Sequence, residues 1–133
     1  MQSRILVGAL ALVASLVAGA AVTRSAADPV LKWAAVNLTE TTSIAGAFVS
    51  GPVLFVHDDA KMARGEPCTG VYRFQPGKGM GEEIVSFHCK PRWSSAPSQF
   101  TAATSRDPNG PRVLREYQFA GDTEAHGVPA RSH

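Results

Sequence analysis

The sequence CTGVYRF at residues 68–74, followed by QPGKGMG at 75–81 and EEIVSFHC at 82–89, is typical of a β-hairpin. Both outer segments alternate along the chain, and successive side chains of a strand point to opposite faces. The three glycines and the proline of the middle segment disfavour a continued strand and favour a turn. The mainly apolar face predicted by this alternation consists of Cys68, Gly70, Tyr72 and Phe74 on the first arm and Val85, Phe87 and Cys89 on the second.

The two cysteines suggest the register of this hairpin. With Cys68 opposite Cys89, Tyr72 falls opposite Val85, and the two apolar faces coincide. We therefore predict a Cys68–Cys89 disulfide, which in the chain-entropy model closes a loop of roughly 20 residues and stabilises the fold by about 3 kcal/mol. Because disulfide geometry is demanding, free thiols and sulfurs bound to a metal are the alternatives.

The rest of the chain predicts further short strands joined by turns. One helical turn is expected over residues 60–64, with Asp59 as its N-cap and Gly65 at its end. No alternation of strands with long helices is present, so the sequence predicts an all-β fold: a small antiparallel sandwich or barrel of six to seven short strands. Outside the hairpin that the predicted disulfide closes, strands are expected over residues 30–38, 44–49, 53–57, 99–105 and 112–119.

The N-terminus is typical of an export signal. A basic residue, Arg4, precedes an apolar run that ends in small residues, which predicts a signal helix over residues 1–27 with cleavage after residue 20 or 27. A single β-domain over 28–120 and a partly flexible tail over 121–133 are expected to follow. Because the apolar run is long enough to span a bilayer, a membrane-anchored envelope protein that keeps this helix is an alternative.

The charge balance argues against nucleic acid as a partner. The chain has 13 Lys and Arg against 11 Asp and Glu, and the excess of two comes from Arg4 and Arg24. The part after the predicted signal is therefore neutral, and it lacks the concentrated basic face that binds a phosphate backbone.

A candidate metal site lies at the end of the predicted 53–57 strand. His57 and Asp59 point to the same face of an extended chain, whereas Asp58 points to the other. An imidazole and a carboxylate are ligands for zinc, copper or another divalent ion. The competing interpretation is structural, with a strand end followed by an aspartate turn and a helix cap.

Two further histidines extend this hypothesis. His88 precedes Cys89 in the predicted hairpin and is expected to face away from it, and His126 would join His57 if the C-terminal tail folds back. Each of them alone is a weak metal ligand, and for each a structural role is the competing interpretation. The aromatic residues Trp33, Tyr72, Trp93, Phe100 and Tyr117 are expected to build the core rather than a binding face.

The function predicted first is a non-enzymatic binding or accessory module outside the cytoplasm, periplasmic or secreted. Two cysteines in an exported chain favour a disulfide, and the sequence has no GxSxG or CxxC motif. The expected partner is a protein or a small molecule, without stable membrane insertion once the signal is cleaved. No cofactor is expected in this interpretation. The alternative is a divalent-metal-binding protein or metal-dependent enzyme that uses His57, Asp59, His88 and His126.

Overall fold

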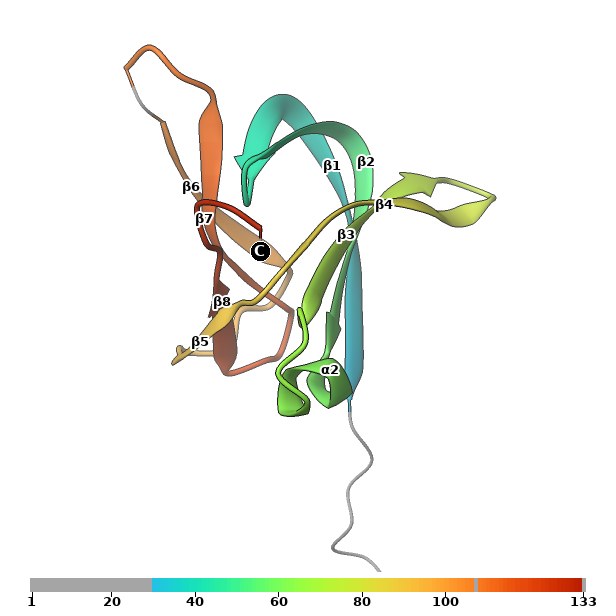
Figure 1. The fold of residues 1–133 in the computed structure, drawn as a ribbon, viewed down its shortest axis with the longest axis vertical. Coiled ribbons are helices and arrows are strands. Elements are labelled where there is room, and N and C mark those ends of the chain that lie inside the picture. The colour runs from blue at the N-terminus through green and yellow to red at the C-terminus, as the bar shows by residue number, and fades with distance from the viewer. Residues whose placement is uncertain (1–29, 107, 133) are drawn as a thin grey trace, which may run out of the picture.

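The computed structural model describes residues 30–106 and 108–132, so the predicted signal segment over 1–27 lies outside the described part. The described chain folds into one eight-stranded sheet with the order β4-β3-β2-β1-β7-β8-β5, and β6 pairs with β7 (Figure 1). The predicted all-β class is confirmed. The elements are β1 (Leu31–Ile44), β2 (Ala47–Asp58), α2 (Asp59–Ala63), β3 (Thr69–Gln75), β4 (Gly79–Phe87), β5 (Lys90–Trp93), β6 (Thr101–Arg106), β7 (Arg112–Gln118) and β8 (Glu124–Gly127).

The two longest strands, β1 and β2, form one hairpin that curls over toward β7 (Figure 1). Its tight turn uses Ala45 and Gly46, both with positive φ. The sequence predicted breaks between strands at residues 39–43 and 51–52, but both segments lie inside these strands. The structure therefore has two long strands where three short ones were predicted. Gly51 (φ 83°) lies opposite Leu38 where the register shifts, and this irregularity lets the strand continue through Pro52.

The β3–β4 hairpin exists, but its predicted register was wrong by one residue. Thr69 pairs with Phe87 and Val71 with Val85 at its base, with irregularities further along. The inward face of β3 is therefore Thr69 and Val71, while Tyr72 points to the outer side of the sheet. A threonine is tolerated inside because its hydroxyl is hydrogen-bonded to Tyr117.

The helical turn after β2 begins one residue earlier than predicted. Asp58, not Asp59, is the N-cap of α2, and its side chain accepts hydrogen bonds from the backbone N–H groups of Ala60 and Lys61. Gly65 follows the helix with positive φ, as expected of a residue that ends a helix.

The C-terminal segment contains structure that the sequence did not predict. Residues 124–127, assigned to an irregular tail, form β8, which pairs with both β7 and β5. Ala125 and His126 of this strand are fully buried. Beyond β8, the N–H of Ser132 donates to the carbonyl of Ala45 at 2.9 Å, so the chain end is fastened to the β1–β2 turn.

The core lies between the two halves of the sheet. A short parallel pairing joins β1 to β7, and the sheet folds so that the inner faces of β2 and β7 meet. The rings of Phe55 and Tyr117 are 5.4 Å apart across this interface, and Phe100 packs against both. No helix in the described residues is long and apolar enough to cross a membrane.

Candidate metal centre

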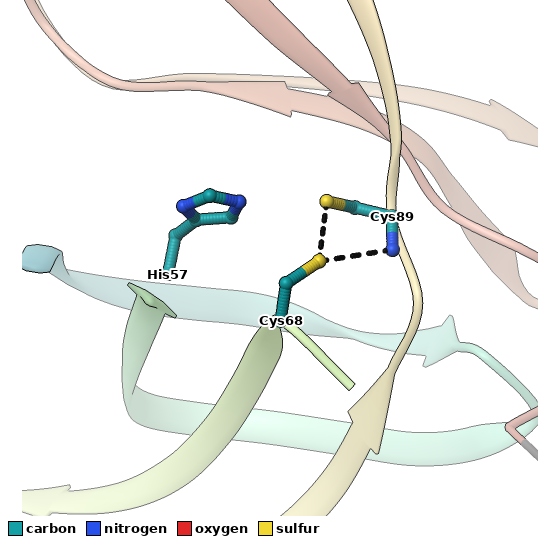
Figure 2. A group of neighbouring side chains, drawn as sticks. All are labelled: His57, Cys68 and Cys89. Atoms are coloured by element: carbon teal, nitrogen blue, oxygen red, sulfur yellow. Dashed lines mark hydrogen bonds between the residues drawn. The ribbon is translucent and has the colours of Figure 1, made fainter. Parts of the chain in front are cut away.

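Four metal-ligating side chains from both halves of the sheet gather at one end of this core. They are His57 at the end of β2, Cys68 before β3, Cys89 between β4 and β5, and His126 in β8. Their exposed fractions are 0%, 3%, 8% and 0%. Figure 2 shows the two thiol side chains directed toward each other, with one ring nitrogen of His57 facing the sulfurs and the other facing away.

Backbone pairing holds these residues in place. His57 is paired with Thr69 in the β2–β3 ladder, and the N–H of Asp58 donates to the carbonyl of Cys68 at 2.9 Å. Cys89 precedes β5, which pairs with β8 and so brings His126 close. The Cys89 sulfur is 3.6 Å from Nδ1 of His126.

The predicted disulfide is not formed, and both cysteines are free thiols. Their sulfurs are 2.6 Å apart, whereas a disulfide bond measures about 2.05 Å. The backbone N–H of Cys89 donates to the Cys68 sulfur at 3.2 Å. Hydrogen bonding from the Cys89 thiol is the main cause that lowers the pKa of Cys68, with a further contribution from His57. The same interaction raises the pKa of Cys89.

The two histidines make few hydrogen bonds. Both ring nitrogens of His57 and Nε2 of His126 are buried and form no hydrogen bond of good geometry among the described residues, although carboxylate oxygens lie 3.3 Å from Nδ1 of His57 and 4.0 Å from Nε2 of His126. The two rings are 4.3 Å apart between centroids. Burial and, second, the neighbouring His57 lower the pKa of His126 to about 4, so this imidazole is neutral at pH 7. A buried polar atom without a hydrogen bond lowers the stability of a fold by about 1–3 kcal/mol. This arrangement therefore destabilises the protein unless a ligand binds the nitrogens.

Carboxylates border the histidines on the solvent side. Oδ1 of Asp59 lies 3.3 Å from Nδ1 of His57, and Oε1 of Glu124 lies 3.6 Å from Nδ1 of His126. Both carboxylates are more than two-fifths exposed. A third, Asp122, is 4.0 Å from Nε2 of His126 and is bound at 2.6 Å by Nζ of Lys32. Burial alone would raise the pKa of Asp122, but the hydrogen bond from Lys32 and the other favourable interactions outweigh it and lower that pKa.

Two of the other residues predicted as metal ligands, Asp59 and His126, each lie beside His57, but Asp59 belongs to neither group of side chains that could hold one ion together. The exposed His88 is not part of the cluster. The sequence did not predict that Glu124 lies beside His126, or that the two thiols lie together with both His57 and His126. One available signal was the spacing of Glu124 and His126, because residues two apart in a strand share a face.

The aromatic residues divide between the core and the outer surface. Phe100 and Tyr117 pack in the core as predicted, but Trp33 and Trp93 are 65% and 77% exposed. Trp33 borders a hollow of about 470 Å³ on the outer side of the sheet, and Cys68 is among the residues that line it. Most of its other walls are apolar: Leu31, Leu54, Val56, Tyr72, Phe74 and Met80.

Comparison with known proteins does not identify this site. No family model matches the chain, and no curated protein or solved structure is significantly similar to it.

Proposed function

We propose that this domain binds one thiophilic transition-metal ion, such as Zn²⁺, through Cys68, Cys89, His57 and His126. The observation that carries the proposal is the burial of both cysteines and both histidines in one cluster, with three ring nitrogens that lack a hydrogen-bond partner. A metal ion would take the lone pair of one nitrogen from each imidazole, which would remove part of the cost of burying these rings.

The donor set suits the proposed ion. Two thiolates and two imidazoles form the Cys₂His₂ combination that holds tetrahedral zinc, and the two thiolate charges balance the ion. In such a site, the sulfurs lie about 3.8 Å apart and each sulfur lies about 3.5 Å from each nitrogen. The 3.6 Å separation of Cys89 and His126 already fits, whereas the sulfurs at 2.6 Å must separate by roughly 1.2 Å.

Four protein ligands leave no open coordination position, so the proposed ion holds the fold together rather than carrying out catalysis. It would join β2, β8 and the segments before β3 and β5. In this proposal, the export predicted from residues 1–27 is kept, and the domain is a metal-binding module that acts outside the cytoplasm.

Metal titration of the full chain under anaerobic, reducing conditions tests the proposal. We expect one Co²⁺ per chain, with an intense sulfur-to-cobalt charge-transfer band, and stoichiometric displacement by Zn²⁺. His57→Ala and His126→Ala should each weaken binding by more than about 100-fold, because each removes a direct ligand. His88→Ala is the matched control, since this histidine is exposed beside Cys89, and it should bind as the unaltered chain does. Reduced chain that folds and takes up no metal would disprove the proposal.

A second candidate function is the binding of an apolar small molecule in the outer hollow. It is favoured by the 470 Å³ volume, which is within the range of about 300–1,000 Å³ usual for small-molecule sites, and by the apolar walls. An apolar fluorescent dye should bind to the unaltered chain and to Trp93→Ser but not to Trp33→Ser. Both tryptophans are exposed, and only Trp33 borders the hollow. Equal dye binding by the two variants would rule out this candidate.

A further inference from the structure

The described residues contain two overlapping groups of possible metal ligands that share His57. The first is His57, Cys68 and Cys89, and the second is His57, Glu124 and His126. Within each group, the ligand atoms all lie within 4.8 Å of one another. The first group offers sulfur, whereas the second offers two nitrogens and one oxygen.

The two groups respond differently to oxidation. Thiolates bind metal, and sulfurs joined in a disulfide do not remain as thiolate ligands. Imidazoles and a carboxylate are unaffected by thiol oxidants, and two histidines with one glutamate form an established zinc-binding set that leaves one position for water. The separation of 2.6 Å between the sulfurs is about 0.6 Å longer than the bond that would join them.

We propose that oxidation of the cysteine pair does not empty the metal site but moves the ion onto His57, His126 and Glu124. Both histidines stay bound, the two sulfurs leave, and the Glu124 carboxylate and a water molecule take their places. This inference rests on the proposed metal-binding function. The closed sulfur site becomes an open, harder site that binds Zn²⁺ less tightly.

The oxidant in this step is a small external disulfide. One cysteine thiolate attacks it, forms a mixed disulfide and releases one external thiolate. The second cysteine thiolate then displaces the other external thiolate, and the Cys68–Cys89 bond forms. The protein loses two electrons, the external disulfide gains them, and the metal ion keeps its charge.

The structure provides access for both parts of this change. Cys68 is among the residues that line the outer hollow, and Cys89 is 8% exposed between the exposed His88 and Lys90, so a small disulfide would approach the sulfurs from these two sides. The Glu124 side chain is 42% exposed and its Oε1 is already 3.6 Å from Nδ1 of His126. A rotation of this side chain, without backbone rearrangement, therefore brings the oxygen to the ion.

The test uses Co²⁺ with the full chain before and after treatment with oxidised glutathione. We expect the charge-transfer band to disappear on oxidation while equilibrium dialysis still finds one Co²⁺ per chain, at least about tenfold more weakly bound. Glu124→Gln should weaken binding to the oxidised chain at least about tenfold and leave the reduced chain within about threefold. Glu82→Gln, which alters an exposed carboxylate on β4 outside the outer hollow, is the control and should change neither state.

The double substitution Cys68→Ser and Cys89→Ser separates the two proposals without any oxidant. This variant should bind Co²⁺ with no charge-transfer band, and adding Glu124→Gln should abolish that binding. Loss of Co²⁺ from the oxidised chain, or binding that is indifferent to Glu124, would overturn the ligand exchange while the reduced site stands. If the reduced chain itself binds no Co²⁺, the proposed function fails.

Discussion

Tyr117 is stacked on His126, with ring centroids 4.9 Å apart and planes inclined by 20°. The two residues face each other directly in the β7–β8 ladder. The hydroxyl of Tyr117 is hydrogen-bonded to the hydroxyl of Thr69 next to Cys68, and burial raises the pKa of this tyrosine. Tyr117 thus connects β8, which carries His126, with β3, which follows Cys68.

The Thr69–Tyr117 hydrogen bond can be tested with a double-mutant cycle. Tyr117→Phe should destabilise the metal-free fold by about 1–3 kcal/mol, because it leaves the buried Thr69 hydroxyl with only a long contact of 3.9 Å to the Cys68 sulfur. Thr69→Val combined with Tyr117→Phe should recover part of this loss. Urea unfolding of the two single variants and the double variant measures the coupling, and strictly additive effects would contradict it.

We expect His57 to destabilise the fold when no metal is bound. Its two unpaired nitrogens predict that His57→Leu raises the free energy of unfolding without metal by roughly 1–3 kcal/mol while metal binding is lost. His88→Leu, at an exposed position, should stay within about 0.5 kcal/mol of the unaltered chain. Urea unfolding in the presence of a chelator compares the two. A destabilised His57→Leu variant would show that this histidine has a structural role instead.

Metal removal should lower stability by an amount set by mass action. At free Zn²⁺ of 1,000 times its dissociation constant, the reduced chain should gain about 4 kcal/mol, and excess chelator should remove all of it. Thermal unfolding with and without chelator provides the measurement. The double variant Cys68→Ser and Cys89→Ser should gain less at the same Zn²⁺ concentration, and an equal gain would place the ion away from the sulfurs.

The ion pair between Lys32 and Asp122 should support the metal centre from outside. Lys32→Met leaves a mostly buried carboxylate without its cation, so we expect a loss of about 1–2 kcal/mol, reduced from the value for a fully buried pair by the partial exposure of Lys32. Metal affinity should fall roughly tenfold, since Asp122 borders His126 and its Oδ1 accepts the N–H of Glu124. Arg64→Met, which breaks the exposed pair with Glu66, should leave metal affinity unchanged. If both variants bound metal equally well, Asp122 would have no part in positioning His126.

Gly70 should control the shape of the outer hollow. A Cβ atom at this position would lie 2.7 Å from the ring of Tyr72, so Gly70→Ala must displace that ring. Because the contact is with the far end of a side chain, we expect stability to change by less than about 1 kcal/mol. Dye binding in the hollow should change, whereas Co²⁺ binding to the reduced chain should not. Unchanged dye binding would show that Tyr72 does not shape the binding surface.

Local patterns in the sequence predicted much of the sheet. The β3–β4 hairpin was predicted from the alternation in residues 68–74 and 82–89 and from the turn between them. The two cysteines lie close together, as expected. The register was wrong because Tyr72 and Phe74 are more apolar than Thr69, yet Thr69 is the residue that faces inward. Its partner Tyr117 is distant in the sequence, so the hydrogen bond that permits this burial was not visible there.

Local patterns in the sequence could not predict the complete cluster of candidate metal ligands. His57 and Asp59 were expected to lie on the same side and are close together, although Asp59 is the first residue of α2 and not part of the strand. β8 is only four residues long and contains no β-branched residue, so nothing in its sequence predicted a strand or the burial of His126. The approach of this strand to Cys89 depends on pairing between β5 and β8, which is a property of the whole sheet.

The pairing of β8 with the sheet also determines when the cluster of two cysteines and two histidines can form during folding. His57 is on the second strand and His126 on the last, and contacts between residues so far apart in the chain form late. A nascent or truncated chain that lacks β8 has the cysteine pair and one histidine but cannot enclose an ion with both imidazoles. A protein molecule with all four ligands on one ion would therefore have finished folding.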